Sequence, residues 1–212
     1  MPLPRSFYLR PARTVARDLL GCILTSRRGR ALTAGRIVET EAYLGPEDAA
    51  SHAAFRPGSH WLFYGRGGVA YVFVNYGTHC CLNAITGRAG TPGCVLIRAL
   101  EPVRGRAAMA RRRGVPGDAT RLASGPGNLT RALGVTLRDN GGDLTRAPLT
   151  IEPDPIARRF AIASGPRVGI TRSVDLPLRF WIADNPFVSR RSVRPALTRG
   201  RSGAPRPSRR DR

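Results

Sequence analysis

Short segments in which apolar and polar residues alternate, or in which β-branched residues gather, make up much of the chain. Helical spacing of apolar residues predicts helices over 12–21 and 102–113 and a third helix that begins near Asn128. Strands are expected over 22–26, 35–44, 69–75, 79–85, 94–100, 160–163, 168–171 and 178–183. This order predicts a mixed α/β (α+β) fold in which a few helices flank one mixed sheet.

The chain has 212 residues, of which 42% are hydrophobic, enough for a core that folds without disulfides or metal. We find no repeat and no internal linker, so residues 1–197 are expected to form one domain. Residues 198–212 consist mainly of Arg, Ser, Pro and Gly, which predicts a basic disordered tail. This tail either adds DNA affinity without sequence preference or is solvated and has no role.

The formal net charge of +21 implies an anionic partner, with nucleic acid favoured over a membrane surface. All of the Lys and Arg residues are arginines, whose planar forks suit phosphate. The start of the chain lacks the features of a secretory signal, and no apolar run is long enough to cross a membrane. We therefore expect a cytoplasmic protein, close to the nucleoid in a bacterium or nuclear in a eukaryote.

The cysteines do not show the spacing of a metal site or of a disulfide framework. Cys22, Cys80, Cys81 and Cys94 form no C-x-x-C pair, and the histidines do not add a ligand pattern. We expect reduced thiols, no bound metal and no cofactor.

Two segments carry candidate chemistry. In the strand expected over 35–44, Glu41 and Tyr43 share one face, so a carboxylate that could act as a general base lies beside a flat aromatic platform. The alternative is a solvated strand face. Tyr76 lies at the turn of the hairpin formed by 69–75 and 79–85, where an exposed ring could wedge into nucleic acid or fold back over the sheet.

Arg98 lies in an apolar run that is suited to burial. A buried guanidinium needs acceptors or a carboxylate, because an unpaired buried charge is too costly. Glu41 is the expected partner, although a structural pair with Glu39 or Glu101 remains open.

The chain closely resembles the alkyladenine (methylpurine, 3-methyladenine) DNA glycosylases in blocks that follow one another in the family's order. The blocks are RIVETEAYLGPEDAASH at 36–52, YVFVNYG at 71–77, CLN at 81–83, VLIRALEP at 95–102, SGPGNL at 124–129, PRVGI at 166–170 and PLRF at 177–180. The resemblance covers roughly residues 6–188 and implies a monomer with a curved, mainly antiparallel sheet and a protruding DNA-inserting hairpin.

The resemblance also implies roles for the candidate residues. Glu41 would be the catalytic base that activates water, and Arg98 would position both. The substrate pocket for a flipped-out base would be lined by Tyr43 and His52 with Phe73 on the other side, and Asn83 would hinder guanine. Tyr76 would fill the gap left in the duplex.

The implied reaction is hydrolysis of the N-glycosidic bond of a damaged purine in double-stranded DNA, which leaves an abasic site. Methyladenine, methylguanine, ethenoadenine and hypoxanthine are the expected lesions. Because the chain has no lysine, a strand-nicking Schiff base is not expected, and the enzyme would be monofunctional.

Alternatives are a non-catalytic lesion- or nucleic-acid-binding protein on the same fold and an RNA-associated basic protein. Phe73, where the family usually has tyrosine, and Thr78 depart from the family pattern.

Overall fold

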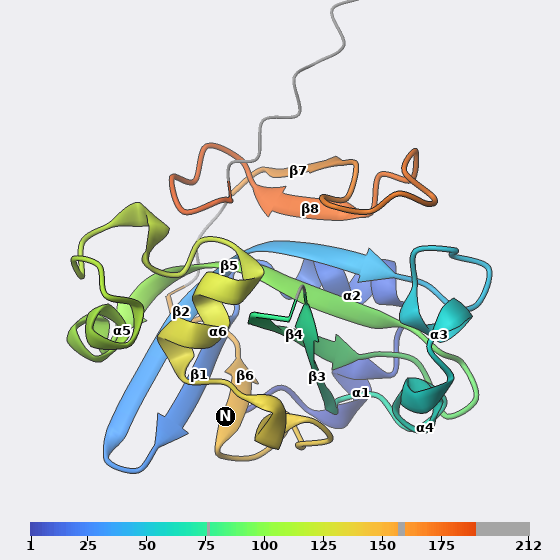
Figure 1. Ribbon diagram of the computed structural model, residues 1–212, viewed down its shortest axis with the longest axis horizontal. Helices are drawn as coiled ribbons and strands as arrows, with labels where there is room; N and C mark the ends of the chain where they lie inside the picture. Colours follow the sequence, from blue (N-terminus) through green and yellow to red (C-terminus); the bar gives the residue numbers. More distant parts are fainter. Residues whose placement is uncertain (76, 157–159, 190–212) are drawn as a thin grey trace, which may run out of the picture.

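The computed structural model describes residues 1–75, 77–156 and 160–189, and it contains an open eight-stranded sheet flanked by short helices (Figure 1). The strands are β1 (Ile23–Arg28), β2 (Ala31–Tyr43), β3 (Ala70–Asn75), β4 (His79–Ile85), β5 (Cys94–Arg104), β6 (Leu149–Glu152), β7 (Ile162–Gly165) and β8 (Arg179–Ile182). The α-helices are α1 (Arg5–Tyr8), α2 (Ala12–Asp18), α3 (His52–Phe55), α4 (His60–Phe63), α5 (Arg106–Arg113) and α6 (Pro126–Leu133). Short 3-10 helices are η1 (Pro57–Ser59), η2 (Thr120–Leu122) and η3 (Leu137–Asp139).

The sheet follows the order β3-β4-β5-β2-β1-β6, and β8 adds to β2 and carries β7. Every strand pairing in the described part of the chain is antiparallel. The expected mixed fold with a mainly antiparallel sheet and flanking helices is therefore confirmed. Strands β3 and β4 form the expected hairpin, whereas the curvature of the sheet and the protrusion of this hairpin stay predictions.

Strand β2 is the centre of the sheet and has different neighbours along its length. Its first half pairs with β1, up to Arg36, and residues Glu39–Glu41 pair with β8, while β5 runs along the other side. Successive residues of a strand point to opposite faces. The Thr40 hydroxyl donates to the Ala16 carbonyl of α2 at 2.8 Å, so α2 covers the face opposite to Glu41.

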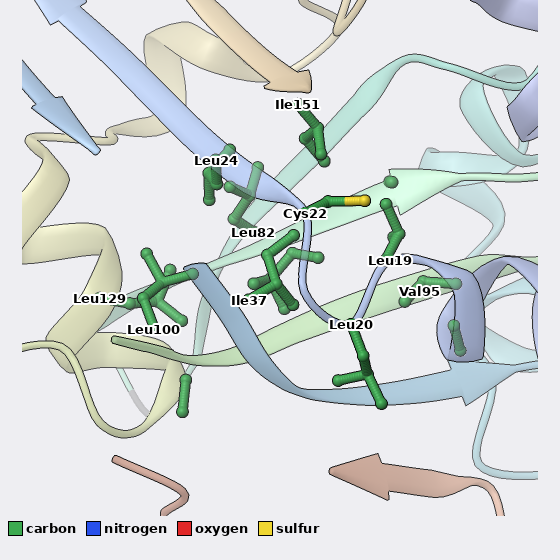
Figure 2. Packing of buried hydrophobic residues seen from close by; sticks show 14 of the residues in the cluster. Leu19, Leu20, Cys22, Leu24, Ile37, Leu82, Val95, Leu100, Leu129 and Ile151 are labelled. Atoms are coloured by element: carbon green, nitrogen blue, oxygen red, sulfur yellow. The ribbon is translucent and has the colours of Figure 1, made fainter. Parts of the chain in front are cut away.

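Aliphatic side chains from α2, α6 and the central strands pack into one main core (Figure 2). Leu19, Leu24, Ile37, Leu100 and Leu129 are fully buried in this core. Burial of an aliphatic side chain of this size contributes about 1.5–3 kcal/mol to folding. The core therefore fixes the central strands and α6, which together carry much of the site described below.

The structure corrects two expected elements. The helix expected over 102–113 begins only at Arg106, because Pro102 still pairs with Gly35 in the sheet and Gly105 turns the chain with a φ of 75°. The strand expected over 168–171 is wrong, since this segment is a loop. Strand β6 was not expected from the sequence, and β7 lies slightly later than predicted.

All four cysteines are free thiols. No group of three or more His, Cys, Asp or Glu side chains that could hold a metal ion occurs within the described ranges. Among the same residues, no helix has the length and apolar character needed to span a membrane.

Candidate active site

Glu41 and Tyr43 lie on the same face of β2, as their spacing predicts. The Tyr43 hydroxyl donates to Glu41 Oε2 at 2.9 Å. The backbone N–H of Val168, from the loop before β8, donates to Glu41 Oε1 at 2.7 Å. The Glu41 side chain is fully buried, and both of its oxygens are therefore held in fixed positions.

Arg98 pairs with two glutamates of β2. Its Nη1 lies 3.3 Å from Glu41 Oε1, and its Nε donates to Glu39 Oε1 at 2.9 Å. Glu39 was an open alternative from the sequence, whereas Glu101 instead pairs with Arg36 at 2.7 Å. The bond to Glu39 fixes the guanidinium, so that its remaining N–H groups can face Glu41.

Glu39 is a structural carboxylate with several donors. Besides Arg98, it accepts hydrogen bonds from Arg179 Nε at 2.7 Å, the Ser189 backbone N–H at 2.7 Å and the Ser189 hydroxyl at 2.9 Å. A buried carboxylate with this many donors is well compensated for the loss of water. Glu41 has three such partners, Tyr43, Val168 and Arg98.

The protonation of Glu41 reflects opposing influences. Burial is the largest and raises the pKa of Glu41, while Arg98, the Val168 N–H and the Tyr43 hydroxyl lower it. Burial dominates, so the pKa of Glu41 lies above its ordinary value. Burial also raises the pKa of Tyr43 well above its ordinary value, so its phenol keeps the proton that it donates to Glu41.

Two cavities that share lining residues lie next to the partners of Glu41, although Glu41 itself lines neither of them. The first, of about 520 Å³, contains Tyr43, and the second, of about 650 Å³, contains Arg98. Val168 lines both cavities. Each of the three partners of the buried Glu41 carboxylate therefore borders at least one of these cavities.

The four residues expected to contact the base, Tyr43, His52, Phe73 and Asn83, all line the first cavity. The rings of His52 and Phe73 are only 4.5 Å apart between centroids, so no base fits between them. They form one wall with Tyr71, whose ring stacks on Phe73 at 5.2 Å, rather than two opposite walls. A flat ligand in this cavity would therefore lie against this wall rather than between His52 and Phe73.

His52 is neutral near pH 7. Burial and the nearby Arg56 lower the pKa of His52 to about 4. Its Nδ1 lies 2.8 Å from the Tyr71 hydroxyl, which also contacts Ser59 Oγ at 3.2 Å. Tyr71 was not singled out from the sequence, although it stands in the matched block 71–77.

Asn83 is held at the inner side of the first cavity. Its Nδ2 donates to the Tyr71 carbonyl at 3.1 Å, and its side chain is almost fully buried. Among the described residues, the other amide atom, Oδ1, accepts only from the weak thiol donor of Cys94 at 3.9 Å. The amide orientation is thus fixed by the protein. Tyr76, the residue expected to enter the duplex, lies outside the described residues.

A buried ion pair that the sequence analysis missed lies against Tyr43. Arg167 donates to Asp48 through Nη1 at 2.5 Å and Nη2 at 2.8 Å, and both side chains are fully buried. The guanidinium also lies 4.6 Å from the centre of the Tyr43 ring. Both residues stand in matched blocks, yet their separation of 119 positions gives no local signal for a contact.

Comparison with known proteins identifies the family of the chain. The family model described as Methylpurine-DNA glycosylase (MPG) matches residues 6–186. Relatives carrying the name "Putative 3-methyladenine DNA glycosylase" come from Koribacter versatilis, with 48% identity over 89% of this chain and 93% of that protein, and Methanoculleus marisnigri, with 46% identity over 90% and 100%. A third, from Bacillus subtilis, is 42% identical over 89% of this chain and 97% of its own. The chain belongs to the methylpurine-DNA glycosylase family, and it is a DNA glycosylase, a hydrolase of N-glycosyl bonds that acts in DNA repair by base excision.

Proposed function

We propose that this glycosylase removes alkylated or deaminated purines from double-stranded DNA by means of a water that Glu41 activates. The lesions are methyladenine, methylguanine, ethenoadenine and hypoxanthine. The observation that carries the proposal is the Glu41 carboxylate, whose partners Arg98, Val168 and Tyr43 border two cavities that share lining residues.

The first cavity supports recognition of a flipped-out purine. Its volume of about 520 Å³ suits a small flat ligand, and aromatic rings line it. The base lies against the wall of His52 and Phe73, in the cavity that Tyr43 also lines. One N–H of the Asn83 amide is bound to the Tyr71 carbonyl, and the other opposes the exocyclic amino group of guanine, since two donors that face each other leave both unpaired.

The attacking water binds where Glu41, Arg98 and Val168 meet. There, Glu41 takes one proton from the water, and the oxygen forms a bond to the anomeric carbon of the sugar. The bond between that carbon and the ring nitrogen breaks, and its electron pair leaves with the base. The negative carboxylate also stabilises the oxocarbenium-like sugar, as in the hydrolysis of glycosides.

Alkylation assists this step because it places positive charge on the purine, which then leaves as a neutral base. Neutral lesions lack this assistance and need a proton on the leaving base. Because the chain has no lysine, the reaction ends with an abasic site and without strand cleavage through a lysine adduct. The enzyme acts as a monomer in this proposal.

The test is single-turnover release of each of the four lesions from duplex oligonucleotides by the wild type and Glu41→Gln, with a chelator present. General-base catalysis of this kind contributes roughly 100- to 10,000-fold, so Glu41→Gln should slow release by about that factor. Glu152→Gln is the matched control, because the same change is made on the edge strand β6, where Glu152 is partly exposed. Equal rates for Glu41→Gln and Glu152→Gln would refute the role of Glu41, and loss of wild-type activity on chelation would refute a metal-free reaction.

A further inference from the structure

Helices α5 and α6 lie side by side (Figure 1), and together with the short helix η2 they carry five arginines beyond Arg106, the first residue of α5. We call this group the α5–α6 arginine cluster, and its members are Arg111, Arg112, Arg113, Arg121 and Arg131. Over residues 105–134, the sequence has six arginines and a single acidic residue, Asp118. The cluster therefore carries a large local excess of positive charge.

The arginines of the cluster are held by neutral groups. Arg112 donates to the Ala132 carbonyl at 2.9 Å, and Arg113 donates to the Leu122 carbonyl at 3.0 Å. Within the described residues, no member of the cluster forms an ion pair with a carboxylate. A carbonyl oxygen orients a guanidinium without neutralising it. The guanidinium therefore keeps its positive charge, and its remaining N–H groups can donate to an anion.

The buried arginines of the fold, in contrast, are paired with carboxylates. Arg36 pairs with Glu101 and Asp154, and Arg167 pairs with Asp48. Carboxylates thus neutralise the buried arginines of the described chain, whereas the members of the cluster keep their charge available to a bound anion.

Repulsion between neighbouring arginines also indicates that the positive charge of the cluster is not neutralised. Burial is the largest influence that lowers the pKa of Arg112, and the neighbouring charges of Arg28 and Arg111 lower it further. Burial likewise lowers the pKa of Arg113, followed by the charges of Arg131 and Arg121. Like charges held this close destabilise the free protein, and a bound anion relieves that repulsion.

The cluster adjoins the active site. Arg121 lines the second cavity together with Arg98, and Pro126, the first residue of α6, lines both cavities. A strand that delivers a base into the first cavity and its sugar to Glu41 must continue away from this boundary. The second cavity and the cluster beyond it offer such a path.

We propose that the α5–α6 arginine cluster binds the phosphate backbone of the duplex that flanks the damaged nucleotide. This inference rests on the proposed function and adds the surface along which DNA lies. Guanidinium groups suit phosphate because two parallel N–H groups match two phosphate oxygens. Such contacts position the duplex and do not depend on its sequence.

The test measures binding of an undamaged duplex by fluorescence anisotropy between 50 and 200 mM salt, which needs no base release. The variant is Arg111→Gln with Arg121→Gln, because both side chains are exposed and neither has a hydrogen bond or ion pair to lose in the described part of the chain. The matched control is Arg13→Gln with Arg17→Gln on α2, which covers the sheet face opposite to Glu41. Thermal unfolding of each variant checks that the fold is intact.

Each phosphate contact contributes about 0.9 to the slope of log affinity against log salt. Loss of two contacts should therefore lower this slope by about 1.8 and make the fall in affinity between 50 and 200 mM salt about 12-fold smaller than in the wild type. The α2 control should keep the wild-type slope.

Two results would contradict the proposed role of the cluster in DNA binding. The cluster variant could keep the slope of the wild type, or the α2 control could lose as much slope as the cluster variant. The two proposals fail in distinguishable ways. A wild type that binds DNA through the cluster but releases none of the lesions would contradict only the proposed reaction. A wild type that releases lesions while the cluster variant keeps its slope would contradict only the inference.

Discussion

The buried pair of Asp48 and Arg167 predicts a large loss of stability when one partner is neutralised. In Asp48→Asn, Arg167 keeps its charge, because a guanidinium does not lose its proton in proteins. Both side chains of the pair are fully buried, so the unpaired charge cannot reach water. Asp48 also accepts hydrogen bonds from the backbone N–H groups of Leu44 and Ala50, each at 3.1 Å, which fixes the loop after β2.

The expected magnitude follows from this burial. Removal of one partner of a buried ion pair costs about 3–5 kcal/mol of unfolding free energy. For a chain of this size, each kcal/mol lowers Tm by roughly 2–4 °C, so Asp48→Asn should lower Tm by roughly 6–20 °C. The double variant Asp48→Asn with Arg167→Met should recover much of this stability, because it leaves no unpaired charge in the interior.

Calorimetry or a thermal-shift assay measures the effect. The matched control is Asp18→Asn, which breaks the pair of Arg10 and Asp18, whose side chains are 37% and 46% exposed. An exposed pair contributes about 0–1 kcal/mol, so this control should change Tm only slightly. If Asp48→Asn lowers Tm no more than Asp18→Asn does, the assignment of a buried, uncompensated charge is refuted.

Two further predictions concern protonation. If Glu41 acts as the proposed base, the excision rate should rise with pH through its raised pKa, because only the ionised carboxylate can take a proton. Tyr43→Phe removes a hydrogen bond that lowers this pKa, so the rise should move to higher pH in a single-turnover pH profile. A midpoint in Tyr43→Phe that is equal to or below that of the wild type would contradict this reasoning. The ring signals of His52 in an NMR titration should change near pH 4, because burial and Arg56 disfavour its charged form, and a midpoint near 6.5 would show that this burial is absent.

Local patterns in the sequence predicted most of the strands and part of the site. The alternation in 35–44 placed Glu41 and Tyr43 on one face, and the hydrogen bond between them confirms this. The apolar run around Arg98 correctly required a buried partner. These inferences succeed because strand geometry alone fixes which side chains share a face.

The remaining parts of the site depend on contacts between distant segments. The donor from Val168 to Glu41 is a backbone N–H across 127 positions, and the segment that carries it was expected to be a strand. Backbone groups have no residue signature, so a sequence cannot reveal which carboxylate they serve. The contact between His52 and Phe73 likewise arises from the packing of α3 against β3, which spacing does not predict.

The hydrogen bonds from Ser189 to Glu39 join residues 150 positions apart, so they can form only late in the synthesis and folding of the chain. Glu39 in turn holds Arg98, so the geometry around Glu41 is complete only after nearly all of the described chain has been synthesised and docked. A ribosome-bound chain that has formed β1 to β5 already contains both glutamates and Arg98. Such a chain still lacks the groups that fix them, and excision activity should therefore begin only with the docking of the last described segment.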